Sequence, residues 1–126
     1  MTRHVVSVDM QDTIEKVEHV LNQHKISSAP VVDFAADGRK NECFGIISLR
    51  DIAYFHEMKK NAKSTRAWEI CSHRPHEIGP DVPIGDVAQI MIDKGFHHLV
   101  VMNDKSIVGF VSSLDVLREL AIQAKG

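Results

Sequence analysis

The side chains best suited to chemistry form a Ser-x-x-Asp motif that occurs twice, as Ser48 with Asp51 and as Ser112 with Asp115. Each motif precedes an apolar run that predicts a helix, so each aspartate lies just inside a helix start. An ionised carboxylate there can accept hydrogen bonds from both hydroxyls of a cis-diol, such as that of a ribose. The helix start also presents backbone N–H groups, which can bind a phosphate together with the serine hydroxyl.

The same motif also has a purely structural interpretation. Ser-x-x-Asp before an apolar run is a helix-capping pattern, which stabilises a helix start by about 1 kcal/mol. A cap explains each motif taken alone. Ligand binding becomes the better hypothesis only if both motifs occupy matching places in a larger repeat.

Such a repeat is present, and it covers most of the chain. Three segments recur in the same order: residues 13–17 as 83–87, 26–32 as 96–102, and 45–51 as 109–115. The offset is 70 for the first two segments and 64 for the third, so the second copy is six residues shorter. The missing residues map to the polar turn at 36–41, which carries Asp-Gly and can shorten without affecting a core.

Each copy predicts the element order strand-helix-strand-strand-helix. In the first copy we expect a strand over residues 5–8, a helix from Thr13 capped by Asp12, strands over 29–32 and 44–48, and a helix from Leu49 that buries Ile52, Phe55 and Met58. In the second copy we expect a helix that starts at Pro83 and ends at Gly95, strands over 99–102 and 107–112, and a helix from Ser113 that buries Val116, Leu117 and Leu120. Each small unit leaves one sheet face bare, which predicts an α/β fold with the two copies packed sheet to sheet about a pseudo-twofold axis.

Composition narrows the classes of partner. The chain has 126 residues and a formal net charge of -2, with no sequence-wide basic field to hold a nucleic acid. Its apolar runs are far shorter than a membrane helix requires, and the start lacks the apolar core of a signal peptide. We therefore expect a cytoplasmic protein that binds neither nucleic acid nor membrane, with Cys43 and Cys71 reduced. The expected domains are residues 1–60 and 68–126, joined by a polar linker at 61–67.

The repeated pattern resembles the CBS domain, the small repeat named after cystathionine β-synthase. The resemblance rests on the element order and on Gly-h-h-Ser-x-x-Asp, where h is apolar, at residues 45–51 and 109–115. The segment 69–75 looks like the family's leading segment, and its later part matches residues 1–5 at the same offset. The resemblance implies a regulatory module that binds an adenine nucleotide (AMP, ADP or ATP) in clefts between the copies. It also implies no catalytic cofactor and no catalysis.

The family's ligand residues carry over to matching positions. The resemblance assigns Ser48 and Ser112 to phosphate, and Asp51 and Asp115 to ribose. The remaining expected ligand residues are Ser27, Ser28, Arg50, Ile70, His73, His76, His97, His98, Leu114 and Val6. Because the second copy has His97-His98 where the first has Ser27-Ser28, we expect the Asp115 site to be better equipped for phosphate. One histidine of that pair must face away, since neighbours on a strand point to opposite sides.

Other functions fit the sequence less well. A metal site at His73-x-x-His76 or His97-His98 lacks further ligands at suitable spacing. An enzyme would need a nucleophile beside a base, or a phosphate-binding glycine loop, and neither pattern occurs.

Two alternatives stay open, a binder of S-adenosylmethionine and an interaction module with degenerate pockets. The second helices would offer apolar dimer contacts at Tyr54, Phe55, Met58, Leu117 and Leu120. In each case we expect a homodimer and an unidentified effector protein as partners.

Overall fold

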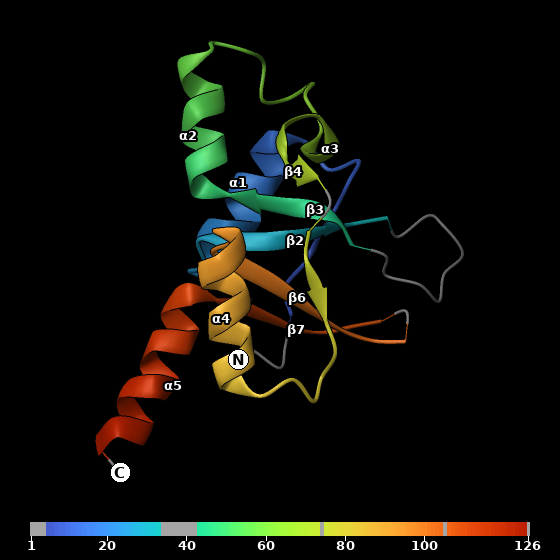
Figure 1. Ribbon diagram of the computed structural model, residues 1–126. Helices are drawn as coiled ribbons and strands as arrows, with labels where there is room; N and C mark the ends of the chain where they lie inside the picture. Colours follow the sequence, from blue (N-terminus) through green and yellow to red (C-terminus); the bar gives the residue numbers. More distant parts are fainter. Residues whose placement is uncertain (1–4, 34–42, 74, 105, 126) are drawn as a thin grey trace. The chain divides into compact units, whose positions relative to one another are not determined.

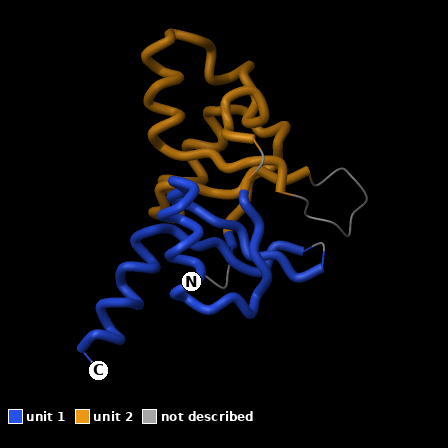
Figure 2. The backbone as a smooth tube through the Cα atoms, in the orientation of Figure 1, with its two compact units in different colours: residues 1–5, 76–126 blue, residues 6–75 orange. Residues whose placement is uncertain are grey.

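The computed structural model describes residues 5–33, 43–73, 75–104 and 106–125 (Figure 1). The chain divides into two compact units, with residues 6–75 in one and residues 76–125 making up most of the described part of the other (Figure 2). The polar turn expected at 36–41 lies outside the described residues. None of the helices in the described ranges is long and apolar enough to cross a membrane.

The first unit contains the predicted element order and two further short elements. Its elements are β1 (Val8–Asp9), α1 (Ile14–Gln23), β2 (Ser28–Val32), β3 (Cys43–Ser48), α2 (Leu49–Glu57), α3 (Ala67–Ile70) and β4 (Ser72–His73). The sheet order is β1-β2-β3-β4, with β1 and β2 parallel and the other pairs antiparallel. Sequence patterns did not predict α3 or β4 as separate elements, because both are too short to show a periodicity.

The second unit contains the predicted element order alone. Its elements are β5 (Glu77–Ile78), α4 (Ile84–Lys94), β6 (His98–Asn103), β7 (Ser106–Ser112) and α5 (Ser113–Lys125). The sheet order is β5-β6-β7, with β5 parallel and β7 antiparallel to β6. Gly95 ends α4 at a φ of 69°, a left-handed conformation that favours glycine, as predicted. The α/β prediction is confirmed, since each unit is a small mixed sheet with helices.

Strand alternation determines which side chains form each core. In the first unit the core cluster joins β2 and β3 to α1 and α2 through Ala29, Val31, Ile47, Val17, Leu21, Ile52 and Phe55. In the second unit the corresponding cluster contains Leu99, Val101, Val111, Val87, Met91 and Val116. Successive strand residues point to opposite faces, so Ser28, Ser48, His98 and Ser112 lie on the sheet faces turned away from these clusters.

Several expectations about the helices and the first strand are wrong. The strand spans Val8–Asp9 rather than residues 5–8. Helix α1 begins at Ile14 and is capped by Thr13, whose hydroxyl accepts the Lys16 N–H at 3.2 Å. Asp12 instead accepts the Asp9 N–H at 3.0 Å and pairs with Lys16.

The expected burial on the second helices is also partly wrong. Met58 is 49% exposed because α2 ends one residue earlier. Leu117 is 62% and Leu120 37% exposed, since only Val116 of α5 is buried. Phe55, expected as a dimer contact as well as a core residue, is 2% exposed and belongs to the core.

The segment expected to be a linker belongs to the first unit. The Glu15 N–H donates to the Ala62 carbonyl and the Ile14 N–H to the Thr65 carbonyl, each at 3.0 Å. In the opposite direction, the Ala67 N–H donates to the Asp12 carbonyl at 2.8 Å. These bonds satisfy the first amides of α1, which an isolated helix leaves unpaired. The repeat boundaries drawn from the sequence stay a prediction, because a sequence repeat and a compact unit need not end at the same residue.

The close approach of β4 to β3 requires a glycine. Gly45 pairs with His73, and the Ser72 hydroxyl donates to the Ile46 carbonyl at 3.0 Å. A Cβ added at Gly45 would overlap the Ser72 carbonyl oxygen and lie 2.9 Å from the Cys71 Sγ. The first residue of the Gly-h-h-Ser-x-x-Asp motif therefore holds β4, and α3 before it, against β3.

Cys71 packs at this junction and is 6% exposed. Burial raises the pKa of its thiol from 9.0 to about 11, and the negative charge of Asp51 acts in the same direction, while a backbone hydrogen bond opposes it. The thiol is therefore neutral at physiological pH.

Replacing Gly45 by Ala is expected to lower the free energy of unfolding by about 1–3 kcal/mol, because backbone atoms of β4 must move to admit the methyl group. Gly85→Ala is the matched control, since a Cβ there meets no atom within 4 Å. Gly85 lies in α4, so alanine should leave stability unchanged or raise it by up to about 1 kcal/mol. Urea titrations of both variants measure this, and equal effects would contradict the steric argument.

Cys71 makes stability fall at high pH. Its folded pKa lies above the unfolded value, so its contribution is complete below pH 9.0 and is lost as the pH rises toward about 11. We expect the melting temperature of the wild type to fall more steeply across this range than that of Cys71→Ala. Parallel slopes for the two proteins would show that the thiol does not titrate with a raised pKa.

Candidate functional site

Both Ser-x-x-Asp motifs form reciprocal helix caps. The Ser48 N–H donates to Asp51 Oδ2 at 2.9 Å, and the Asp51 N–H donates to Ser48 Oγ at 3.1 Å. The same two contacts join Ser112 and Asp115, at 2.9 and 3.1 Å. Each cap uses only Oδ2 of its aspartate, so capping leaves Oδ1 of Asp51 without a hydrogen bond to any described residue. The capping interpretation is correct, and it does not exclude a second role.

The helix starts offer fewer free amides than the sequence suggested. The Leu49 N–H donates to the Ser27 carbonyl at 2.8 Å, and the Ser113 N–H donates to the His97 carbonyl at 2.9 Å. With the aspartate amides held by the caps, only the middle amide of each first turn, at Arg50 or Leu114, has no partner among the described residues. A phosphate at either helix start would therefore depend on side-chain donors as well.

Strand register selects one residue from each paired candidate. Ser28 lies directly opposite Ser48, and His98 directly opposite Ser112. Opposed residues on antiparallel strands share a face, with Cβ atoms about 4.5–5.5 Å apart. His98 therefore lies on the face of Ser112, where its ring stacks on Phe110 with centroids 5.2 Å apart.

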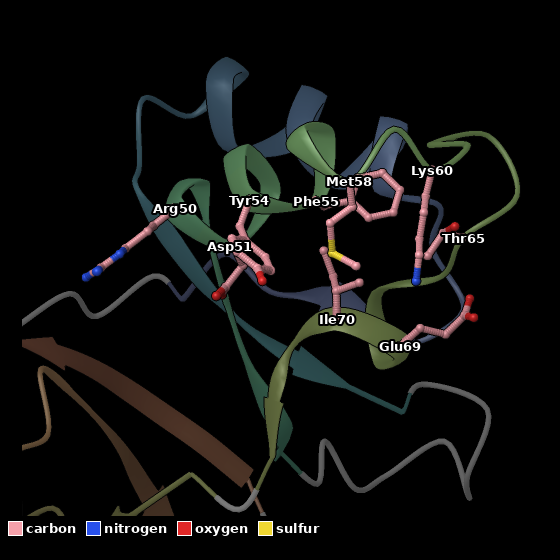
Figure 3. Close-up of a pocket in the computed structure, with 9 residues that line it drawn as sticks. All are labelled: Arg50, Asp51, Tyr54, Phe55, Met58, Lys60, Thr65, Glu69 and Ile70. Carbon is pink, nitrogen blue, oxygen red and sulfur yellow. The ribbon is translucent and has the colours of Figure 1, made fainter.

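The first unit contains a cavity of about 550 Å³ that includes Asp51 (Figure 3). Its lining residues are Arg50, Asp51, Tyr54, Phe55, Met58, Lys60, Thr65, Glu69 and Ile70. Three of the expected ligand residues, Arg50, Asp51 and Ile70, therefore line the same cavity. Arg50 lies at the rim, and its guanidinium extends away from the other lining side chains (Figure 3).

The other lining residues were missed for two different reasons. Tyr54, Phe55 and Met58 follow Asp51 at three, four and seven positions, so helical periodicity places them on its side of α2. Lys60, Thr65 and Glu69 line the cavity because the chain folds back along α2 after that helix ends. No local sequence pattern predicts this change of direction.

The cavity has three regions along its length (Figure 3). The Asp51 carboxylate and the Tyr54 side chain lie at one end, Met58 and Ile70 in the middle, and Lys60, Thr65 and Glu69 at the other end. Such a site can accept hydrogen bonds at one end, pack against a flat apolar group in the middle, and both donate and accept at the far end.

The second unit contains a smaller cavity of about 260 Å³ beside Asp115. It is lined by Val82, Ile84, Val87, Val111, Asp115 and Glu119. Neither His97 nor His98 lines it, and its two charged residues are both acidic. Asp115 Oδ1 lies 4.0 Å from an Arg118 Nη1, which is a weak exposed ion pair.

The remaining candidates lie outside both cavities. His73 on β4 has its Nε2 3.1 Å from the Trp68 carbonyl and packs edge-on against Phe44. His76 packs against Phe96, and Val6 is half-buried before β1. Among the residues that the structure describes, no three His, Cys, Asp or Glu side chains gather as a metal site.

Comparisons with known proteins agree with the fold. An uncharacterized protein of Methanocaldococcus jannaschii is 31% identical over 94% of this chain, which spans 41% of that relative. Inosine-5'-monophosphate dehydrogenase of Korarchaeum cryptofilum is 29% identical over 90% of the chain, which spans 22% of that enzyme. The chain thus matches only part of each relative.

A solved CBS domain protein of Pyrobaculum aerophilum, complexed with AMP, superposes with a TM-score of 0.79 at 25% identity, covering 97% of this chain and 95% of that one. The family model for the CBS domain matches residues 1–56 and 67–122, which together make up most of the sequence. The two matched stretches contain the two Ser-x-x-Asp motifs at equivalent places. The chain therefore belongs to the CBS domain family and carries two CBS repeats.

Proposed function

We propose that this CBS pair is a regulatory module that binds an adenine nucleotide, with the Asp51 cavity as its principal site. The observation that carries the proposal is the position of the Asp51 carboxylate at one end of a cavity of about 550 Å³ with an apolar middle. This volume lies within the roughly 300–1,000 Å³ typical of small-molecule sites. The Asp115 cavity is smaller and lined by a second carboxylate, so we assign it a weaker role.

The parts of a nucleotide match the regions of the cavity. Oδ1 of Asp51 would accept from the ribose hydroxyls while Oδ2 keeps its cap. The base would pack on Met58 and Ile70. The phosphate would then lie toward the helix start, near the Arg50 N–H. The Ser48 hydroxyl donates to Asp51 Oδ2 at 3.0 Å and would turn from it to bind the phosphate.

The relative solved with AMP supports an adenine nucleotide as the ligand class. AMP, ADP, ATP and S-adenosylmethionine share the adenosine that this arrangement would hold. The regulatory consequence would be a change at the start of α2 that a partner protein senses.

A second candidate function is self-association. Helix α5 exposes Leu114, Leu117 and Ile122 at 53%, 62% and 65%. Tyr54 of α2 and Met58, which follows the end of α2, are also exposed. Exposed apolar side chains of this number favour a homodimer, which is compatible with nucleotide binding.

Nucleotide binding is tested by thermal shift with AMP, ADP, ATP and S-adenosylmethionine. A ligand that binds only the folded state stabilises it by about 2.7 kcal/mol at 100 times its Kd, so the melting temperature should rise with concentration. We expect Asp51→Asn to abolish most of this shift and Asp115→Asn to reduce it less. No shift with any of the four compounds would exclude the proposal.

Thr13→Ala separates ligand binding from capping. It removes the cap of α1 without changing a lining residue, and should lower stability by about 1 kcal/mol while the nucleotide shift persists. If Thr13→Ala and Asp51→Asn lose the shift equally, Asp51 acts as a cap only.

A further inference from the structure

The end of the Asp51 cavity opposite Asp51 contains polar groups that the proposed ribose and phosphate contacts leave unused. Lys60, Thr65 and Glu69 line this end, beyond Met58 and Ile70 (Figure 3). A ligand held at Asp51 with its base over the apolar middle would present the far edge of that base to these side chains.

The Glu69 carboxylate is held in place by the backbone. The Arg66 N–H donates to Glu69 Oε2 at 2.6 Å, which caps the short helix α3. Helix α3 is itself attached to the start of α1 through the Ala67 N–H bond to Asp12. Oε1 of Glu69 has no hydrogen bond to a described residue, so it is a positioned acceptor.

Lys60 follows a turn that returns the chain along α2. Lys59 adopts a left-handed conformation with a φ of 56°, and its N–H donates to the His56 carbonyl at 3.1 Å. The segment after Lys60 is tied to α1 at Ala62 and Thr65. The ammonium of Lys60 has no carboxylate within 4.0 Å in the described part of the chain, so its donors are free for a ligand.

We propose that Lys60 and Glu69 determine base specificity by hydrogen-bonding the edge of an adenine, an inference that rests on the proposed nucleotide site. Glu69 Oε1 accepts from the 6-amino group, and the Lys60 ammonium donates to a neighbouring ring nitrogen. Adenine presents one donor group beside one acceptor on this edge, which matches one carboxylate and one ammonium. Lys60 and Glu69 are exposed before a ligand binds, so the base itself would cover them. A base without the amino group would leave the Glu69 carboxylate without this hydrogen bond, which lowers affinity.

A phosphate is the other group that Lys60 could bind. The carboxylate of Glu69 lines the same end of the cavity and repels a phosphate there. The pair of Lys60 and Glu69 therefore favours the edge of a base over a phosphate at this end of the cavity. The two possible ligand groups predict different effects of replacing Lys60.

The test is titration calorimetry with AMP, adenosine and purine riboside 5'-monophosphate, which has hydrogen in place of the 6-amino group. The proteins are the wild type, Lys60→Met, Glu69→Gln and the control Lys63→Met, which removes an exposed lysine of the same segment that does not line the cavity. Glu69→Gln keeps an oxygen that can cap α3.

The wild type should prefer AMP over the 6-hydrogen analogue by about 10-fold, the loss expected for one charge-assisted hydrogen bond. Glu69→Gln should reduce this preference to about 2-fold to 3-fold, because the acceptor becomes neutral. Lys60→Met should weaken AMP and adenosine alike by about 10-fold, and Lys63→Met should change neither.

Three results would overturn the inference. If Lys60→Met weakens AMP but not adenosine, Lys60 contacts the phosphate. If AMP binding is lost in Asp51→Asn but unchanged in Lys60→Met and Glu69→Gln, the inference fails while the nucleotide site stands. If the wild type binds no AMP, both fail together.

Discussion

The structure of the first unit depends on the contact between β4 and β3 at Gly45. With no side chain at that position, the Ser72 carbonyl and the Cys71 thiol can pack directly against β3. This contact holds α3 beside α2, and the space left between these helices is the Asp51 cavity. The glycine of the repeated motif is therefore required for the site as well as for the sheet. A larger residue would move Ile70 and Glu69 together with β4.

The serine and aspartate of each motif show how one side chain serves fold and function. Asp51 lines the cavity and caps α2 with Oδ2, so Oδ1 is not needed for the cap. The cap holds the carboxylate in place, so a ligand would find its acceptor already positioned and would lose less entropy on binding. The two interpretations of Ser-x-x-Asp, cap and ligand site, are therefore complementary, and only the second awaits experiment.

The two repeats share a backbone pattern and differ in the chemistry around it. In both repeats, the residue just before a strand, Ser27 or His97, accepts the N–H of the first helix residue through its carbonyl. The larger cavity, beside Asp51, is lined by Lys60, whose ammonium has no carboxylate within 4.0 Å among the described residues. The smaller cavity, beside Asp115, is lined by a second carboxylate, Glu119.

The sequence alone determined the architecture, because the duplicated pattern, the helix stripes and the Gly95 stop are local signals that agree with one another. It also located both aspartates at helix starts and both caps. The tertiary structure decided which residues surround each aspartate. His98 rather than His97 shares a face with Ser112 because of strand register, and Arg50, a suitable cation by sequence, points away from the cavity. Lys60, Thr65 and Glu69 reach the cavity because backbone hydrogen bonds join residues 62–67 to the start of α1. The bonded residues are 47 to 55 positions apart in the sequence, so periodicity cannot predict this contact.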